Sequence, residues 1–218
     1  MISYRETKSS LKNKMKTKLL VFDFDGTLAD TKLAWFTSIF KVLKKMKIYC
    51  PSCEARVIVH FALKIRDFLD HLGLPKKKSE MIASDIYYEF FKQKSRLINN
   101  IDYISSLPGK KIILSNTRTF AIEKILGKHK KIFDGIYGGD KFGEKYAFIK
   151  KEMKKKKLKK NQVYYIADRA GDVQTAKKAG CMSLMIASKH AWSSFDEIMR
   201  EKPDMVVKNL KEIKKIIK

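Results

Sequence analysis

Short apolar runs that end abruptly in polar residues recur along the chain. The clearest is LLVF at residues 19–22, which lies between Lys18 and the sequence DFDGT at residues 23–27. Four consecutive apolar residues are typical of a strand that is buried on both faces, as in a parallel sheet. The polar residues then follow the carboxyl end of the strand. In open α/β sheets that edge is where ligands bind.

Helical spacing replaces the strand pattern after this first run. Apolar stripes cover residues 35–46, 57–72 and 79–97, and Gly73 with Pro75 ends the second of them. No convincing strand pattern interrupts the three stripes. We therefore expect an all-helical insertion between the first strand and the next.

Strands and helices alternate from about Pro108 onward. The expected strands lie at residues 111–114, 136–137, 163–166, 183–186 and 205–207. Helices are expected after the first three of these strands, and Asn209 can cap a further helix, at residues 210–217, after the last strand. This alternation predicts an α/β fold, a Rossmann-like parallel sheet with helices on both faces.

The domain organisation follows from these patterns. Residues 18–31 and 98–218 form the expected α/β core, residues 32–97 an inserted all-helical cap domain, and residues 1–17 a basic leader. At 218 residues with 44% hydrophobic residues, the chain is large and apolar enough for one core domain with an inserted smaller one.

The net charge of +25 suggests an anionic macromolecule as a partner. The excess is mostly Lys and is spread along the chain. Its densest stretch, residues 150–160, retains apolar positions at amphipathic spacing, with Phe148 and Ile149 before it and Met153 within it. We interpret this stretch as the solvated face of a helix, and nucleic acid as the less favoured alternative partner.

Cysteine content and hydropathy bear on the compartment. Three cysteines favour a reducing compartment, and no apolar segment precedes the first strand or reaches membrane-spanning length. We expect a cytoplasmic protein with no membrane partner. The pair Cys50 and Cys53 supplies only half of a zinc site, and we interpret it as two thiols lining a turn of the cap.

Candidate chemistry is concentrated just after the first strand. Asp23 and Asp25 are two residues apart, so a locally extended backbone directs both to one side. Such close carboxylates repel unless a cation lies between them, and Mg²⁺ prefers oxygen ligands. Gly26 permits a sharp turn with an exposed amide, and Thr27 adds a hydroxyl, both of which suit a phosphate oxygen.

Two other strands also end in polar residues that packing does not require. Ser115, Asn116 and Thr117 follow residues 111–114, and Asp168 comes shortly after residues 163–166. Polar groups at three strand ends of one parallel sheet indicate a functional site at that edge.

These motifs resemble those of the haloacid dehalogenase-like phosphohydrolases, in particular the phosphoglycolate-phosphatase-like branch with a helical cap. The chain is similar to the family's first motif at residues 23–27, to its second at LSNT, residues 114–117, and to its fourth at IADRAGD, residues 166–172. The segment PDMVVKNL, residues 203–210, resembles the family's closing strand and helix. The motifs occur in the family's order and on the expected strands.

The resemblance implies a role for each motif acid. Asp23 would attack phosphorus and form an aspartyl-phosphate, and Asp25 would act as general acid and then general base. Mg²⁺ would be held by the Asp23 carboxylate, the Asp25 backbone carbonyl and Asp168, with Asp172 supporting from further out.

It also implies phosphate ligands. Ser115 and the Asn116 amide would hold phosphate oxygens, and a lysine would offset their charge. We assign that role to Lys145, with Lys141 as the competitor. The chain departs from the family where Ala167 and Arg169 flank Asp168, and where no proline follows the lysine.

We therefore expect a Mg²⁺-dependent phosphatase for a small phosphorylated metabolite. A dehalogenase needs no acid at position 25, whereas a phosphomutase would keep the same first motif. A different class is a basic nucleic-acid-binding protein, or a phosphatase for nucleic-acid ends. For the latter, the basic helix should lie beside the site. From the cap, Arg56, Lys64 and Arg66 could reach a second anionic group of the substrate.

Overall fold

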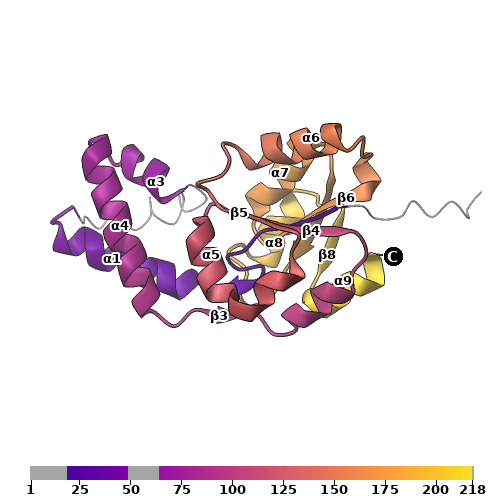
Figure 1. Ribbon diagram of the computed structural model, residues 1–218, viewed down its shortest axis with the longest axis horizontal. Helices are drawn as coiled ribbons and strands as arrows, with labels where there is room; N and C mark the ends of the chain where they lie inside the picture. The colour runs from indigo at the N-terminus through magenta and orange to yellow at the C-terminus, as the bar shows by residue number, and fades with distance from the viewer. Residues whose placement is uncertain (1–18, 49–63, 218) are drawn as a thin grey trace, which may run out of the picture.

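A computed structural model describes residues 19–48 and 64–217 (Figure 1). In this part of the chain, six strands form one sheet in which every paired neighbour is parallel. The strands are β1 Leu19–Phe22, β4 Lys110–Leu114, β5 Gly135–Tyr137, β6 Val163–Ala167, β7 Met182–Ile186 and β8 Met205–Val207. Their order is β5-β4-β1-β6-β7-β8, so β1 lies inside the sheet. The expected α/β fold is confirmed.

Strand β1 is apolar throughout because helices cover both faces of the sheet. Leu20 and Phe22 belong to the apolar cluster that includes α5 (Thr119–Leu126) and α9 (Leu210–Ile216). Leu19 and Val21 belong to the opposite cluster, with α6 (Lys145–Lys155), α7 (Ala170–Ala179) and α8 (Phe195–Arg200). Each of these four strand residues is at most 1% exposed. Burying such a side chain contributes about 1.5–3 kcal/mol.

Among the described residues, three helices form a separate group beside the sheet, at the left of Figure 1. They are α1 (Lys32–Lys45), α3 (Ile65–His71) and α4 (Lys76–Lys92). Their apolar residues share a cluster of their own, in which Trp35 stacks on Phe90 with ring centroids 3.9 Å apart. The cluster also takes in Ala121 of α5, which joins the group to the core. A cap that extends over residues 32–97 stays a prediction.

The helical block differs from the expectation at its ends. Helix α4 begins at Lys76, before Ser79, and ends at Lys92, so Leu97 is not helical. Leu97 pairs instead with Ala29, in a two-stranded antiparallel sheet of β2 (Ala29–Asp30) and β3 (Arg96–Leu97). The expectation of an uninterrupted helical block was therefore wrong. Two-residue strands carry no periodicity that a sequence pattern can detect.

Several short elements were not expected from the sequence. In the part of the chain that the structure describes, they are α8 and three 3₁₀ helices, Ile101–Ser106, Gly127–Ile132 and Lys160–Gln162. The leader at residues 1–17, the pair Cys50 and Cys53, and Arg56 lie outside the described residues. Within the described ranges, no helix has the length and apolar character needed to cross a bilayer.

Candidate active site

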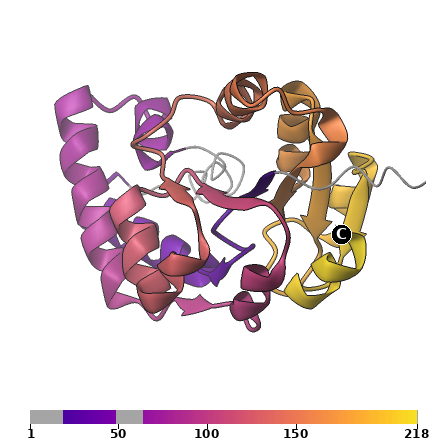
Figure 2. The ribbon, with the colours of Figure 1, turned by 45° about the vertical axis from the view of Figure 1, so that its right-hand side comes forward.

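The carboxyl ends of β1, β4 and β6 lie side by side and supply the polar edge of the sheet. Phe22, the last residue of β1, pairs with Ile113 on one side and Ile166 on the other. Asp23 and Ser115 therefore project from one edge, and Asp168 follows β6 there. A cavity of ≈ 290 Å³ opens at this edge, between the sheet and the helical group. Figure 2 shows that group facing the end of the sheet.

A tight turn after β1 allows the polar residues to gather. Gly26 has φ +77°, and its amide donates to the Ala29 carbonyl at 2.8 Å. A Cβ atom at position 26 would lie 2.3 Å from Asp168 Oδ2 and 2.4 Å from Trp192 Cδ1. Backbone conformation and close packing thus both require glycine.

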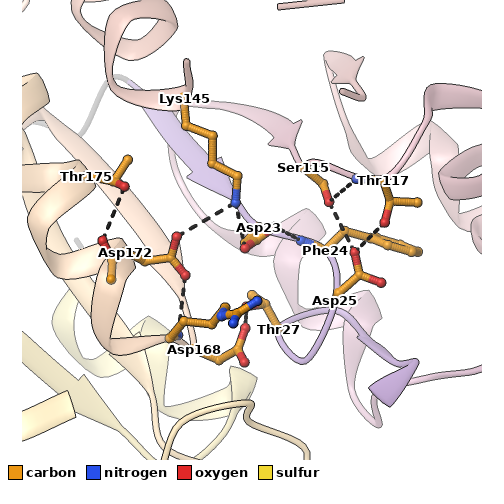
Figure 3. A network of polar contacts seen from close by, with 12 residues as sticks. Asp23, Phe24, Asp25, Thr27, Ser115, Thr117, Lys145, Asp168, Asp172 and Thr175 are labelled. Atoms are coloured by element: carbon orange, nitrogen blue, oxygen red, sulfur yellow. Dashed lines mark hydrogen bonds and ion pairs between the residues drawn. The ribbon is translucent and has the colours of Figure 1, made fainter. Parts of the chain in front are cut away.

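Asp23 is paired with a buried cation. The residue is 4% exposed, Oδ1 accepts from the Phe24 amide at 2.7 Å, and Oδ2 lies 2.8 Å from Lys145 Nζ (Figure 3). Lys145 is the first residue of α6. The competing Lys141 is exposed and lies 3.9 Å from Asp140. The structure therefore brings Lys145, and not Lys141, to the first motif.

A second acid and a tyrosine hold Lys145 in place. Its Nζ donates to Tyr165 Oη at 2.9 Å, and that hydroxyl donates to Asp172 Oδ1 at 2.9 Å. Burial acts to lower the pKa of Lys145, but the carboxylates of Asp23 and Asp172 outweigh it, so the pKa lies above its usual value. The ammonium is therefore charged at neutral pH.

Asp168 is fully buried beside these groups. Oδ1 accepts from Thr27 Oγ1 at 2.6 Å, and Oδ2 accepts from the Trp192 amide at 2.7 Å. Burial, and after it the neighbouring Asp23, raises the pKa of Asp168 well above its usual value. Asp23 thus disfavours the charged form of Asp168, and a divalent cation between the two oriented carboxylates would stabilise this arrangement.

The third expected metal donor also fits. Among the described residues, none donates a hydrogen bond to the Asp25 carbonyl oxygen, which leaves this oxygen able to bind a cation. No cluster of three or more His, Cys, Asp or Glu side chains suited to a metal occurs within the described ranges. The expected ligand set has only two carboxylate side chains, because its third ligand is a backbone carbonyl, so it does not amount to such a cluster. Mg²⁺ commonly completes its coordination shell with water and substrate oxygens.

The Asp25 side chain is held by four donors. Thr31 Oγ1 and Trp35 Nε1 donate to Oδ1 at 2.6 and 2.8 Å. Thr117 Oγ1 and Ser115 Oγ donate to Oδ2 at 2.6 and 3.2 Å. Two of these donors come from the start of the helical group and two from the end of β4. Asp25 is thereby fixed at the boundary between the two parts of the molecule.

The expected site residues fall into two groups. The cavity is lined by Asp23, Asp25, Ser115, Asn116, Lys145 and Asp172. Gly26 and Thr27, which we expected to bind phosphate, do not line it, and neither does Asp168, which we expected to bind the metal. The Thr27 hydroxyl is buried and donates to Asp168, so it orients that carboxylate. Gly26 is needed for the turn and for its close packing.

The sequence assigned no individual role to several contributors. Thr31, Trp35, Thr117, Tyr165 and Trp192 all hydrogen-bond to site residues. A signal existed for Thr117, since it lies two residues after Ser115 in the polar segment that follows β4. None existed for Trp35, because an apolar helical stripe does not show where an indole N–H points.

The most lysine-rich part of the basic helix α6 lies away from the site. Helix α6 begins at the site with Lys145 and ends at Lys155, before the amino end of β6. At 1.5 Å per residue, its last turn lies about 15 Å further along. The lysines at positions 154–157, 159 and 160 therefore lie near the amino ends of the strands, away from the site, which does not favour a nucleic-acid-end phosphatase.

Comparisons with known proteins agree with this geometry. A family model described as "Haloacid dehalogenase-like hydrolase" matches residues 20–186. A phosphoglycolate phosphatase of Vibrio parahaemolyticus is 21% identical, over 92% of this chain and 96% of its own. A phosphoglycolate phosphatase of Pseudomonas savastanoi is 25% identical, over 90% of this chain and 78% of that protein's length.

Solved structures show the same fold. A predicted phosphoglycolate phosphatase from Haemophilus somnus superposes with a TM-score of 0.75 at 20% identity, over 93% of this chain and 98% of that one. A putative haloacid dehalogenase-like hydrolase from Bacteroides fragilis superposes with a TM-score of 0.74 at 19% identity, over 91% of this chain and 100% of that one.

Proposed function

Because the chain belongs to the haloacid dehalogenase-like hydrolase family and is a phosphatase of the phosphoglycolate-phosphatase-like kind, we propose that it hydrolyses a small phosphorylated metabolite with Mg²⁺ and through an aspartyl-phosphate. The observation that carries this proposal is the buried pair of Asp23 and Lys145, 2.8 Å apart, beside Asp25.

Asp23 is the proposed nucleophile. Its carboxylate attacks phosphorus, the bond from phosphorus to the leaving oxygen breaks, and the phosphoryl group stays on the Asp23 carboxylate. Lys145 holds this carboxylate in place through their ion pair, and it offsets charge on the transferred oxygens. Ser115 and Asn116 line the same cavity and bind the phosphate oxygens.

Asp25 is the proposed acid and base. It gives a proton to the leaving oxygen, and it later takes one from the water that attacks the phosphorylated Asp23. The donors Thr31, Trp35 and Thr117 fix its carboxylate in one orientation, so both proton transfers occur at a defined place.

The proposed metal ligands are the carboxylates of Asp23 and Asp168 and the carbonyl of Asp25. Bound there, Mg²⁺ would offset the negative charge of the phosphate and of the crowded carboxylates. Thr27 and the Trp192 amide orient Asp168, and Asp172 acts through Lys145.

Dependence on the metal tests the proposal directly. We expect hydrolysis of p-nitrophenyl phosphate with Mg²⁺, loss of hydrolysis with EDTA, and recovery when Mg²⁺ is added in excess. Mg²⁺ should also raise the melting temperature, because it binds the folded carboxylates and not the unfolded chain. A panel of phosphorylated metabolites then identifies the substrate, and release of free phosphate separates a phosphatase from a phosphomutase. A metal-free chain that turns over equally fast would contradict the proposal.

Asp25→Asn should separate the two chemical steps. Nitrophenolate leaves without needing a proton, so p-nitrophenyl phosphate should release about one equivalent in a burst, after which turnover stalls for want of a base. With an alkyl phosphate, both steps should be slow, with kcat lower by about 10²–10⁴-fold. Stopped-flow absorbance measures the burst.

Trp35→Phe is the matched control for this experiment. It keeps the Asp25 carboxylate and three of its four donors. We expect less than about a tenfold loss of kcat and no burst. An Asp25→Asn variant with steady turnover of alkyl phosphates would show that another group supplies the proton.

A further inference from the structure

The segment 188–193, which lies between β7 and α8, contacts the proposed metal ligand Asp168. The Trp192 amide of this segment donates to Asp168 Oδ2 at 2.7 Å, whereas Oδ1 accepts from the Thr27 hydroxyl at 2.6 Å. Asp168 is fully buried, so these donors decide how its carboxylate is oriented. One of them belongs to an irregular segment, which must itself be held in place.

The α/β core contacts this segment at several points. Ser193 Oγ accepts from the Ala170 amide at 3.0 Å, which ties the segment to the first residue of α7. The Arg169 guanidinium lies 5.3 Å from the Trp192 ring centroid, within range of a cation–π interaction. The ring also lies against the turn after β1, where a Cβ atom at position 26 would be 2.4 Å from Cδ1. These contacts restrict the movement of the indole relative to the core.

The helical group contacts the same segment. Phe36 of α1 packs on the Trp192 ring with centroids 5.5 Å apart, and Lys32 Nζ lies 5.8 Å from the centroid of the indole. Two residues earlier in the segment, His190 Nδ1 lies 2.9 Å from Asp30 Oδ2, at the end of β2. The indole accordingly packs against the apolar cluster of the helical group. The segment therefore bridges the helical group and the proposed metal ligand.

Resting on the proposed metal site, we infer that Trp192 is a positioning residue for Mg²⁺: its ring, packed against Arg169 and Phe36, keeps its amide on Asp168 and thereby sets the affinity of the site for the metal. Loss of a group that orients a metal ligand typically lowers metal affinity by roughly 10–100-fold. Because Phe36 belongs to the helical group, the placement of that group and the binding of Mg²⁺ favour each other.

Calorimetric titration with Mg²⁺ in the absence of substrate tests this role without turnover. Trp192→Ala removes the ring and keeps the amide, Trp192→Phe keeps an aromatic ring, and Phe36→Leu changes only the helical group. Phe91→Leu is the matched control, because Phe91 is also a half-buried aromatic residue of the helical group, but it packs on Phe90. Asp168→Asn should abolish the binding, which shows that the measured heat comes from this site.

We expect the dissociation constant for Mg²⁺ to rise about tenfold in Trp192→Ala and about threefold in Phe36→Leu. Trp192→Phe should restore most of the affinity, and Phe91→Leu should stay within about twofold of the parent. Circular dichroism confirms that each variant is folded at the temperature of the titration, where a merely structural role of the ring would leave the affinity unchanged. The kcat of Phe36→Leu should recover at saturating Mg²⁺, because the loss lies in metal binding.

The outcomes separate this inference from the proposed function. Parent-like affinity in Trp192→Ala, or equal effects of Phe36→Leu and Phe91→Leu, would overturn the role of Trp192 and leave hydrolysis by the parent unaffected. Phe36→Leu, the milder change, decides the question if Trp192→Ala does not fold. The expected affinities without any hydrolysis of p-nitrophenyl phosphate by the parent would refute the catalytic proposal and leave the role of Trp192 standing. No Mg²⁺ binding by the parent would overturn both.

Discussion

Asp23→Asn is expected to lower kcat for p-nitrophenyl phosphate by on the order of 10⁴-fold or more, because an amide is a poor nucleophile and the proposed covalent step is lost. The fold should persist, since Lys145 retains Tyr165 and Asp172 as neighbours. The steady-state rate measures the loss, and far-ultraviolet circular dichroism checks the fold. Hydroxylamine should trap an acyl-phosphate in the parent and none in the variant.

Asp23→Glu separates charge from position. It keeps a negative charge near Lys145, but it moves the attacking oxygen by about one methylene, and misplacement of this size costs on the order of 10²-fold. We expect a nearly inactive enzyme. Substantial activity of the glutamate variant would indicate that position 23 acts through charge alone and that the nucleophile lies elsewhere.

Lys145→Met is expected to impair both stability and catalysis. Its side chain is 12% exposed and is the cation of a cluster that holds Asp23 and Asp172. Removing one partner of a buried ion pair typically costs 3–5 kcal/mol, which corresponds to a drop of roughly 6–20 °C in melting temperature for a chain of this size. Folding raises the pKa of the Lys145 ammonium. The contribution of Lys145 to the free energy of unfolding is therefore complete at neutral pH and is lost only as the pH rises through that raised pKa.

Lys141→Met is the matched control, because it makes the same substitution four residues earlier on an exposed lysine. We expect a melting temperature within about 2 °C of the parent and unchanged kcat. Mg²⁺ should restore part of the stability of the Lys145 variant, because it offsets the same carboxylates. Equal effects at positions 141 and 145 would contradict the assignment of the site lysine.

Much of the α/β core could be predicted from the sequence because its signals are local. The run at residues 19–22 is apolar at every position because clusters lie on both sides of β1, and Asn209 caps α9 by accepting from the Lys211 and Glu212 amides. The pairing of Leu97 with Ala29 could not be predicted, because it depends on where a long insertion returns to the core.

The residues of the candidate site could be predicted from the sequence, but not all of their hydrogen-bond partners could. Asp23, Ser115 and Asp168 could be found because each follows a strand that ends at the same edge. The direction of a side chain is set by tertiary packing, so a motif could not show that the Thr27 hydroxyl points to Asp168 and away from the cavity. Lys145 could be chosen from a chain rich in lysine, but only the structure shows its distance from Asp23.

The indole of Trp35 belongs to two parts of the molecule at once. Its ring stacks on Phe90 within the helical group, and its N–H donates to Asp25 at the end of the sheet. If the helical group shifts as a body, that hydrogen bond must stretch or the stacking must break. The orientation of Asp25 for its proposed proton transfers therefore depends on the placement of the helical group. Substitutions at Phe90, which does not line the catalytic cavity, should for this reason change the rate of the chemical step.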